Sequence, residues 1–158
     1  MRAREAADLK RFRELQLEYE ESLPPDLRHS LPELAALEHV YADPNAAFLA
    51  YDGDDAAGCV AVTELDASTG VLKRLYVKPS YRGRGIARGL VDEVLAFSRG
   101  RGHRRVVLDT ERTRLSAAYQ LYLSLGFVDC EPYGPVDYAS PTYMQLLLEN
   151  DPGADTAT

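Results

Sequence analysis

The chain has 158 residues, of which 46% are hydrophobic, and a formal net charge of −7 at pH 7. This length suits one domain with a single core, and the negative charge argues against nucleic acid or an anionic membrane as a partner. No apolar run approaches the roughly 20 residues that span a bilayer, and the charged first residues do not resemble a signal peptide. Cys59 and Cys130 stand apart, without metal-ligand spacing, so we expect two reduced thiols in a cytoplasmic protein and no metal site.

Two helices are predicted in the first quarter of the chain. Asp8 can cap the first helix, whose apolar residues recur at helical spacing, and Pro24-Pro25 ends it. Ser30 and Glu33, with a proline between them, have the form of a capping box. This pattern predicts a second helix over 31–40.

Strand-like runs dominate the middle of the chain. Three of them, at 47–51, 58–65 and 71–77, are separated by short polar turns, which favours antiparallel hairpins. The elements expected after them are, in chain order, a helix from Ile86 to near Gly100, a strand over 105–108, a helix over 115–125 with Gly126 as its C-cap, and strands over 127–130 and 142–148.

This order of elements predicts an α/β fold with one mixed, mostly antiparallel sheet flanked by helices. The strand–helix–strand unit from 71 to 108 forms a parallel crossover at its centre, and open α/β sheets bind ligands at the carboxyl ends of such strands. We expect a single domain over residues 1–149 and a disordered tail over 150–158.

A glycine- and arginine-rich loop joins the strand over 71–77 to the next helix. Residues 81–87 read Tyr-Arg-Gly-Arg-Gly-Ile-Ala. The glycines let the backbone approach a ligand closely, and the helix start offers unpaired N–H groups with a partial positive charge. Ten basic and two acidic residues lie between Lys73 and Arg105 in an otherwise acidic chain, although the arginines from Arg99 onward are equally typical of a solvated face. The loop predicts a pyrophosphate site.

Two common phosphate-binding motifs fit this loop poorly. A dinucleotide fold has Gly-x-Gly-x-x-Gly after its first strand, whereas Gly83, Gly85 and Gly89 match it only approximately and follow a later strand. The nucleotide P-loop, Gly-x-x-x-x-Gly-Lys-Ser/Thr, is absent from the sequence.

The segment from Leu75 to Ala87 resembles the acyl-CoA-binding motif of the GNAT superfamily of N-acetyltransferases. That motif reads Arg/Gln-x-x-Gly-x-Gly/Ala, and Arg82, Gly85 and Ala87 occupy its fixed positions. A second element typical of the superfamily, Ala-Tyr-Gln-Leu-Tyr-Leu-Ser-Leu-Gly-Phe, follows at 118–127. The resemblance spans roughly residues 46–148.

A bacterial subgroup of the superfamily is more similar still. Its Lys-Arg-Leu-Tyr-Val motif stands at 73–77 and its Leu-Asp-Thr motif at 108–110. Glu18-Tyr19, Gly-Cys-Val-Ala at 58–61 and Pro132-Tyr133 also match the subgroup. The substrates of this subgroup are mostly unassigned, so the match bears on the fold more than on the acceptor.

The resemblance implies acetyl-CoA as co-substrate. The loop amides would hold its pyrophosphate, the strand before the loop would pair with the pantetheine arm, and the Val77 amide would lie near the thioester oxygen. The residues expected to bind the co-substrate are Leu75, Tyr76, Val77, Arg82, Gly83, Arg84, Gly85, Ile86, Ala87 and Arg88.

The resemblance also indicates catalytic candidates. Tyr122 occupies the superfamily position of the general acid, and a phenol with a pKa near 10 keeps its proton at neutral pH. Glu64, Asp109 and Glu111 are candidates for the base by location, and a water chain is the alternative to all three. Many members have asparagine seven residues before the tyrosine, where this chain has Leu115.

A cleft for the acceptor is expected beside these residues. In this fold it would be bordered by Tyr19, Glu20, Glu38, Tyr133 and Tyr138, which form an aromatic and acidic pocket suited to an ammonium group.

The function expected from the resemblance is an N-acetyltransferase. Acetyl-CoA would give its acetyl group to a primary amine of a small molecule, protein or peptide by direct attack. The alternative is a non-catalytic acyl-CoA-binding regulatory domain, which the absent asparagine favours. Because members of the superfamily often dimerise, the resemblance also suggests a homodimer.

Overall fold

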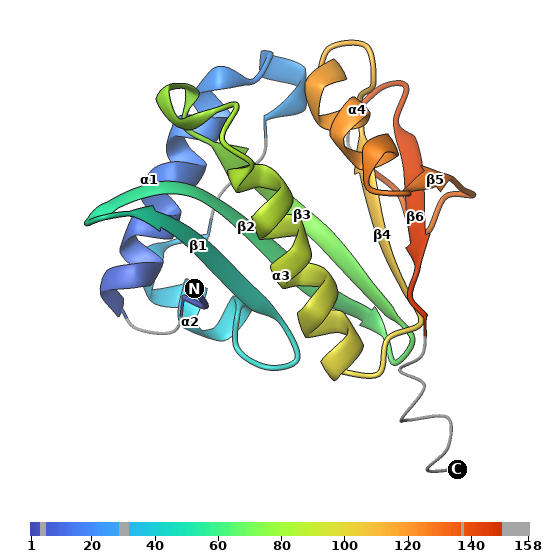
Figure 1. Cartoon of the computed structure of the whole chain (residues 1–158), viewed down its shortest axis with the longest axis horizontal. Helices are drawn as coiled ribbons and strands as arrows, with labels where there is room; N and C mark the ends of the chain where they lie inside the picture. Colours follow the sequence, from blue (N-terminus) through green and yellow to red (C-terminus); the bar gives the residue numbers. More distant parts are fainter. Residues whose placement is uncertain (4–5, 29–31, 137, 150–158) are drawn as a thin grey trace.

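One six-stranded sheet organises the molecule (Figure 1). The structure is a computed structural model that describes residues 1–3, 6–28, 32–136 and 138–149. Its helices are α1 (Ala6–Ser22), α2 (Leu34–Val40), α3 (Ile86–Gly100) and α4 (Ser116–Ser124), with short 3-10 helices η1 (Pro25–Leu27) and η2 (Pro79–Tyr81). Its strands are β1 (Ala46–Asp52), β2 (Asp55–Asp66), β3 (Thr69–Val77), β4 (Arg105–Thr110), β5 (Val128–Asp129) and β6 (Thr142–Leu147).

The sheet is mixed and mostly antiparallel. Its strand order is β1-β2-β3-β4-β6-β5, and only β3 and β4 run parallel among the neighbouring pairs of described strands. The parallel pair is joined through α3, which is the crossover that the sequence predicts. The predicted fold class and the antiparallel hairpins before the crossover are therefore confirmed.

Helices cover both faces of the sheet. α3 crosses one face, where its apolar residues pack on Phe48, Val60 and other side chains of the same face. α1 and α2 pack on the opposite face, against Leu49 and Cys59. Neighbouring residues of one strand thus serve different cores, because successive side chains alternate between the two faces. No helix in the described residues is long and apolar enough to cross a membrane.

The parallel strands separate soon after they meet. β3 and β4 pair only through Thr69, Gly70 and Val71 opposite Arg105, Val106 and Val107. Beyond these pairs β3 continues to Val77 and β4 to Thr110, and the two ribbons diverge (Figure 1). The carboxyl ends of the two strands therefore flank an opening in the sheet, which we call the strand opening.

A bulge in β3 accompanies this separation. Between Cys59 and Ala61 the partner in β3 moves by three residues, from Tyr76 to Lys73. Two residues of β3, Arg74 and Leu75, therefore lie opposite the single residue Val60 of β2. Arg74 has a φ of 60°, which is unusual for a residue with a side chain.

Several predicted boundaries need correction. Asp8 does not cap the first helix, because α1 begins at Ala6 and Asp8 lies inside it, where its carboxylate accepts a hydrogen bond from Tyr51. The second helix begins at Leu34 rather than 31, with Glu33 at the N-cap position and no side-chain cap bond. The predicted strand over 127–130 is reduced to Val128–Asp129. The predicted tail over 150–158 lies outside the described residues.

Candidate active site

The loop after β3 has the backbone of an anion-binding turn. Gly83 and Gly85 both have φ of 80°, and Gly85 is the N-cap residue of α3. A Cβ atom at either position would meet no heavy atom within 4 Å, so these glycines serve the left-handed backbone and not close packing. The first N–H groups of α3, from Ile86 onward, have no partner inside the helix. The loop therefore presents backbone donors at an exposed helix start.

The two arginines of the loop and Arg88, in the first turn of α3, are held differently. Nε of Arg82 donates to the carbonyl oxygen of Val77 at 3.1 Å, and its guanidinium lies 5.9 Å from the ring centre of Tyr76. Arg84 is exposed, and Arg88 donates to the hydroxyl of Ser124 at 3.2 Å. Arg82 thus orders the end of β3, whereas Arg84 and Arg88 leave cationic groups near the helix start.

The backbone of Val77 faces the strand opening. The N–H of Lys78 donates to the carbonyl oxygen of Ala57 in β2 at 2.9 Å. Because backbone groups alternate in direction along an antiparallel pair, the N–H and C=O of Val77 point away from β2. The N–H of Val77 is therefore directed to the side on which β3 and β4 separate.

Tyr122 of α4 is a buried phenol near this opening. Its side chain packs in the core with Phe127, with ring centres 5.7 Å apart, and 6% of the residue is exposed. Burial raises the pKa of the Tyr122 hydroxyl, and the nearby Tyr19 and Asp109 raise it further. Its proton is therefore retained at neutral pH.

Asp109 near the end of β4 is bound by two phenols. Its Oδ1 accepts a hydrogen bond from Tyr133 at 2.5 Å, and its Oδ2 accepts one from Tyr138 at 2.6 Å. Burial and the neighbouring carboxylate raise the pKa of both tyrosines, so both remain donors. A carboxylate has about four acceptor sites, so two remain for a further donor such as an ammonium group.

The end of α1 supplies aromatic and acidic groups to the same region. Burial raises the pKa of Tyr19 to about 12, and its ring centre lies 5.3 Å from that of Tyr76. The hydroxyl of Tyr76 donates to Glu18 at 2.9 Å, and Glu20 lies 3.5 Å from Arg74.

Four of the five residues predicted to border the acceptor cleft gather here, namely Tyr19, Glu20, Tyr133 and Tyr138. Glu38 is exposed on α2, and no contact in the described chain joins it to this group.

Glu64 lies in a different part of the sheet. It pairs in register with Gly70, near the start of β3 and far from Val77 at its end. One carboxylate oxygen of Glu64 lies 2.7 Å from Nε2 of His103, which is buried after α3. Asp109 is near enough to Tyr122 to raise its pKa, whereas Glu64 is not among the groups that affect Tyr122.

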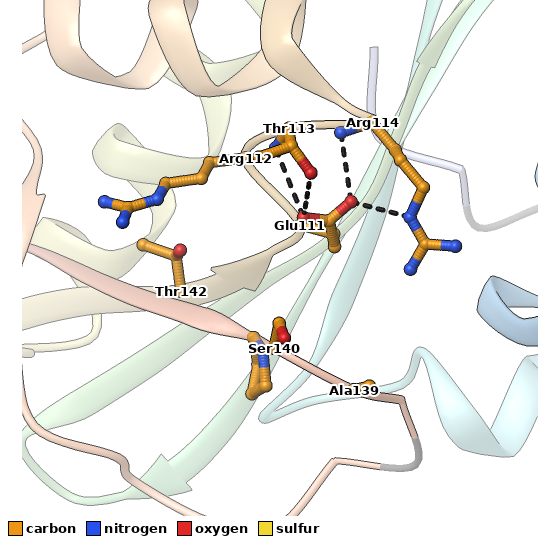
Figure 2. A pocket seen from close by; sticks show the side chains of 8 residues that line it. Glu111, Arg112, Thr113, Arg114, Ala139, Ser140 and Thr142 are labelled. Carbon is orange, nitrogen blue, oxygen red and sulfur yellow. Dashed lines mark hydrogen bonds and ion pairs between the residues drawn. The ribbon is translucent and has the colours of Figure 1, made fainter.

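Glu111 is committed to building the turn before α4. Its carboxylate accepts hydrogen bonds from the N–H and hydroxyl of Thr113 and from the N–H and Nε of Arg114, at 2.7 to 3.2 Å (Figure 2). These bonds lower the pKa of Glu111 to about 2. With its oxygens occupied in this way, Glu111 is poorly placed to act as a base.

Gln16 is a buried polar residue whose contacts the sequence did not reveal. It lies on the buried face of α1, where its amide donates to the carbonyl oxygen of Arg74 at 3.0 Å and to the thiol of Cys59 at 2.9 Å. These bonds hold the β3 bulge beside the strand opening. The available signal was an uncharged polar residue within a buried helical stripe.

Comparison with known proteins gives consistent matches. Residues 9–127 match the acetyltransferase (GNAT) family. The uncharacterized N-acetyltransferase C1271.07c of Schizosaccharomyces pombe is 35% identical over 146 residues, which cover 89% of this chain and 89% of that protein. The uncharacterized N-acetyltransferase YsnE of Bacillus subtilis is 32% identical over 111 residues, which cover 70% of this chain and 71% of YsnE.

A solved structure shares the fold. The structure of yncA from Salmonella typhimurium with its cofactor acetyl-CoA aligns with a TM-score of 0.77 and 18% sequence identity. The alignment covers 96% of this chain and 94% of that one. At this level of identity the similarity concerns the arrangement of helices and strands.

Proposed function

Because this chain belongs to the acetyltransferase (GNAT) family, we propose that it transfers the acetyl group of acetyl-CoA to a primary amine of a small molecule or peptide. The observation that carries the proposal is the strand opening, where β3 runs on to the glycine loop and β4 runs on to Asp109, whose charge raises the pKa of Tyr122. A binding groove and two groups able to exchange protons thus share one region.

The residues of this region fit an acyl-CoA. The backbone donors of the loop and the first turn of α3, with Arg84 and Arg88 nearby, suit a pyrophosphate. The free edge of β3 from Leu75 to Val77 suits an extended amide-containing arm, which would add to the sheet as a further strand does.

The proposed chemistry assigns one role to each group. When bound, acetyl-CoA supplies the activated acetyl group. Asp109 accepts a hydrogen bond from the acceptor ammonium and takes a proton from its nitrogen, which becomes nucleophilic. The N–H of Val77 would donate to the acetyl oxygen as the C–N bond forms, and the hydroxyl of Tyr122 would give its proton to the departing thiolate as the C–S bond breaks. The second proton lost by the acceptor nitrogen would return to the Tyr122 oxygen. Glu64 has no part in this proposal, since His103 occupies its carboxylate.

A second candidate function is a non-catalytic acyl-CoA-binding domain. It is favoured by Leu115, which is the N-cap residue of α4 and stands where many family members have asparagine. Both functions require that the protein bind an acyl-CoA, and only the enzyme transfers the acetyl group to an amine.

Turnover across a panel of amines separates the two functions. The assay measures release of the CoA thiol from acetyl-CoA in the presence of amines, amino acids and peptides. Release that depends on an amine is the result expected for the enzyme, together with an acetylated product by mass spectrometry. Acetyl-CoA binding without release across the panel would favour the non-catalytic domain.

A further inference from the structure

A pocket of about 460 Å³ adjoins the proposed acceptor site (Figure 2). It lies between the turn that follows β4 and the segment that leads into β6. Asp109 pairs in register with Tyr143, and the next pair along the strands joins Thr110 to Thr142, which lines the pocket. Thr142 lies on the opposite face of the sheet from Asp109, because successive strand residues alternate between faces, but Glu111 also lines the pocket and is two residues beyond Asp109. A molecule whose amine lies at Asp109 would reach this space by spanning roughly 7 Å past Glu111.

The pocket walls are rich in hydrogen-bond donors. Their side chains include two guanidinium groups, three hydroxyls and one carboxylate, from Arg112, Arg114, Thr113, Ser140, Thr142 and Glu111. The carboxylate of Glu111 is already saturated by its own turn, as described above. The hydroxyls of Ser140 and Thr142 make no hydrogen bond to another residue in the described part of the chain.

Arg112 keeps most of its donors available. In the described chain its nearest acidic partner is Asp129, at 3.9 Å, which is longer than a hydrogen bond, and both side chains are more than half exposed. Arg114 is more occupied, since its Nε binds Glu111 and its Nη1 binds Asp26. Figure 2 shows Arg112 and Thr142 on one side of the pocket and Arg114 on the other.

The far wall of the pocket has an unusual backbone. Ser140 has a φ of 59°, a left-handed conformation that costs a serine free energy and is found preferentially at functional sites. Ser140 faces the turn of Glu111 across the pocket (Figure 2).

We propose that this pocket binds a carboxylate of the acetyl acceptor, so that the preferred acceptors are amino carboxylates. A carboxylate matches the planar guanidinium of Arg112 and accepts from the hydroxyls of Thr142 and Ser140. Asp109 and Glu111 are two residues apart, about 7 Å along an extended chain, so the amine and carboxylate of the acceptor are separated by several bonds. The proposal rests on the proposed function, because it places the reacting amine at Asp109.

The test compares acids with neutral analogues of equal length. The ω-amino acids from β-alanine to 6-aminohexanoate are assayed beside their N-methyl amides, with release of CoA as the readout. For at least one chain length, the acid is expected to have a kcat/KM roughly tenfold to a hundredfold higher than that of its amide. The substitution Arg112→Gln removes this preference and leaves the amides unchanged, whereas the control Arg99→Gln, at an exposed site on α3, changes neither series.

A binding measurement gives a readout that does not depend on turnover. Glutarate, which has no amine, is titrated into the wild-type protein and the Arg112→Gln variant by calorimetry, and only the wild type is expected to bind it. Equal rates for acids and amides, or an acid preference that survives Arg112→Gln, would overturn the carboxylate site. Absence of CoA release with every amine, neutral ones included, would instead contradict the proposed function.

Discussion

At the scale of single residues, Tyr122 carries the most specific chemical assignment. Its burial raises the pKa of the hydroxyl, and the nearby Tyr19 and Asp109 raise this pKa further. A phenol that cannot ionise at neutral pH suits a proton donor and does not suit a base.

We predict that Tyr122→Phe lowers kcat by about 10²- to 10⁴-fold, the usual contribution of a general acid, while acetyl-CoA binds with nearly unchanged affinity. The measurement is steady-state turnover combined with calorimetric titration. Tyr119→Phe, the same change three residues earlier on α4, is the control and should have little effect. Loss of binding in parallel with rate would indicate a structural role for Tyr122.

Glu111 gives a prediction about stability and pH. Its hydrogen bonds lower the pKa from 4.5 to about 2, so the folded state favours the ionised carboxylate. This contribution is complete above the unfolded pKa of 4.5 and is lost as the pH falls towards 2. The Tm difference between wild type and Glu111→Gln should therefore be largest near neutral pH and shrink on acidification. A difference that stays constant from pH 7 to pH 3 would contradict this account.

At the scale of elements, the β3 bulge depends on α1. The side chain of Gln16 binds the carbonyl oxygen of Arg74, which has a left-handed backbone. Gln16→Leu should lower the free energy of unfolding by about 1–3 kcal/mol through the unsatisfied carbonyl. It should also weaken acetyl-CoA binding, because the edge of β3 loses its support.

Adding Arg74→Gly should restore part of that binding, since glycine adopts the left-handed backbone without strain. Calorimetric affinities of the single and double variants measure this coupling. An affinity that Gln16→Leu leaves intact would show that the bulge does not support the binding edge.

Gly58 controls how closely β2, β3 and α3 approach. A Cβ atom there would lie 2.8 Å from the carbonyl oxygen of Tyr76 and 3.2 Å from Leu90 of α3. Gly58→Ala should therefore cost about 1–3 kcal/mol of stability, measured by urea unfolding. Gly89→Ala, in α3 with open space around its Cβ, should instead be neutral or stabilising. Equal effects of the two changes would argue against the close contact at Gly58.

Local patterns predicted the elements and several of their boundaries, such as the end of β3 at Val77 and the span of α3. Alternating apolar runs and the Arg-Gly-Arg-Gly loop identified the strands, the crossover and the start of α3, because these signals are short-range. The bulge at Arg74 and the bond from Gln16 were missed, since they depend on residues that are 58 positions apart and meet only in the fold. The same reason explains Glu64, which lies on a predicted strand yet faces His103.

At the scale of the whole molecule, the fold assembles the site from separate segments. In the proposed function, β3 and its loop provide the surface for the co-substrate, β4 and α4 provide Asp109 and Tyr122, and α1 with the segment before β6 provides the aromatic walls. The family motifs predicted the residues of β3 and its loop, because these residues are contiguous in the sequence. The two phenols on Asp109 required the structure, since 24 and 29 residues separate them from it.

The most direct test of this account is a calorimetric titration of the wild-type protein with acetyl-CoA, with ATP and NAD as comparison ligands. The account predicts saturable binding of acetyl-CoA at one site per chain and no binding of the other two. Failure of acetyl-CoA to bind, or equal binding of ATP or NAD, would contradict the assignment of the strand opening and its glycine loop to an acyl-CoA.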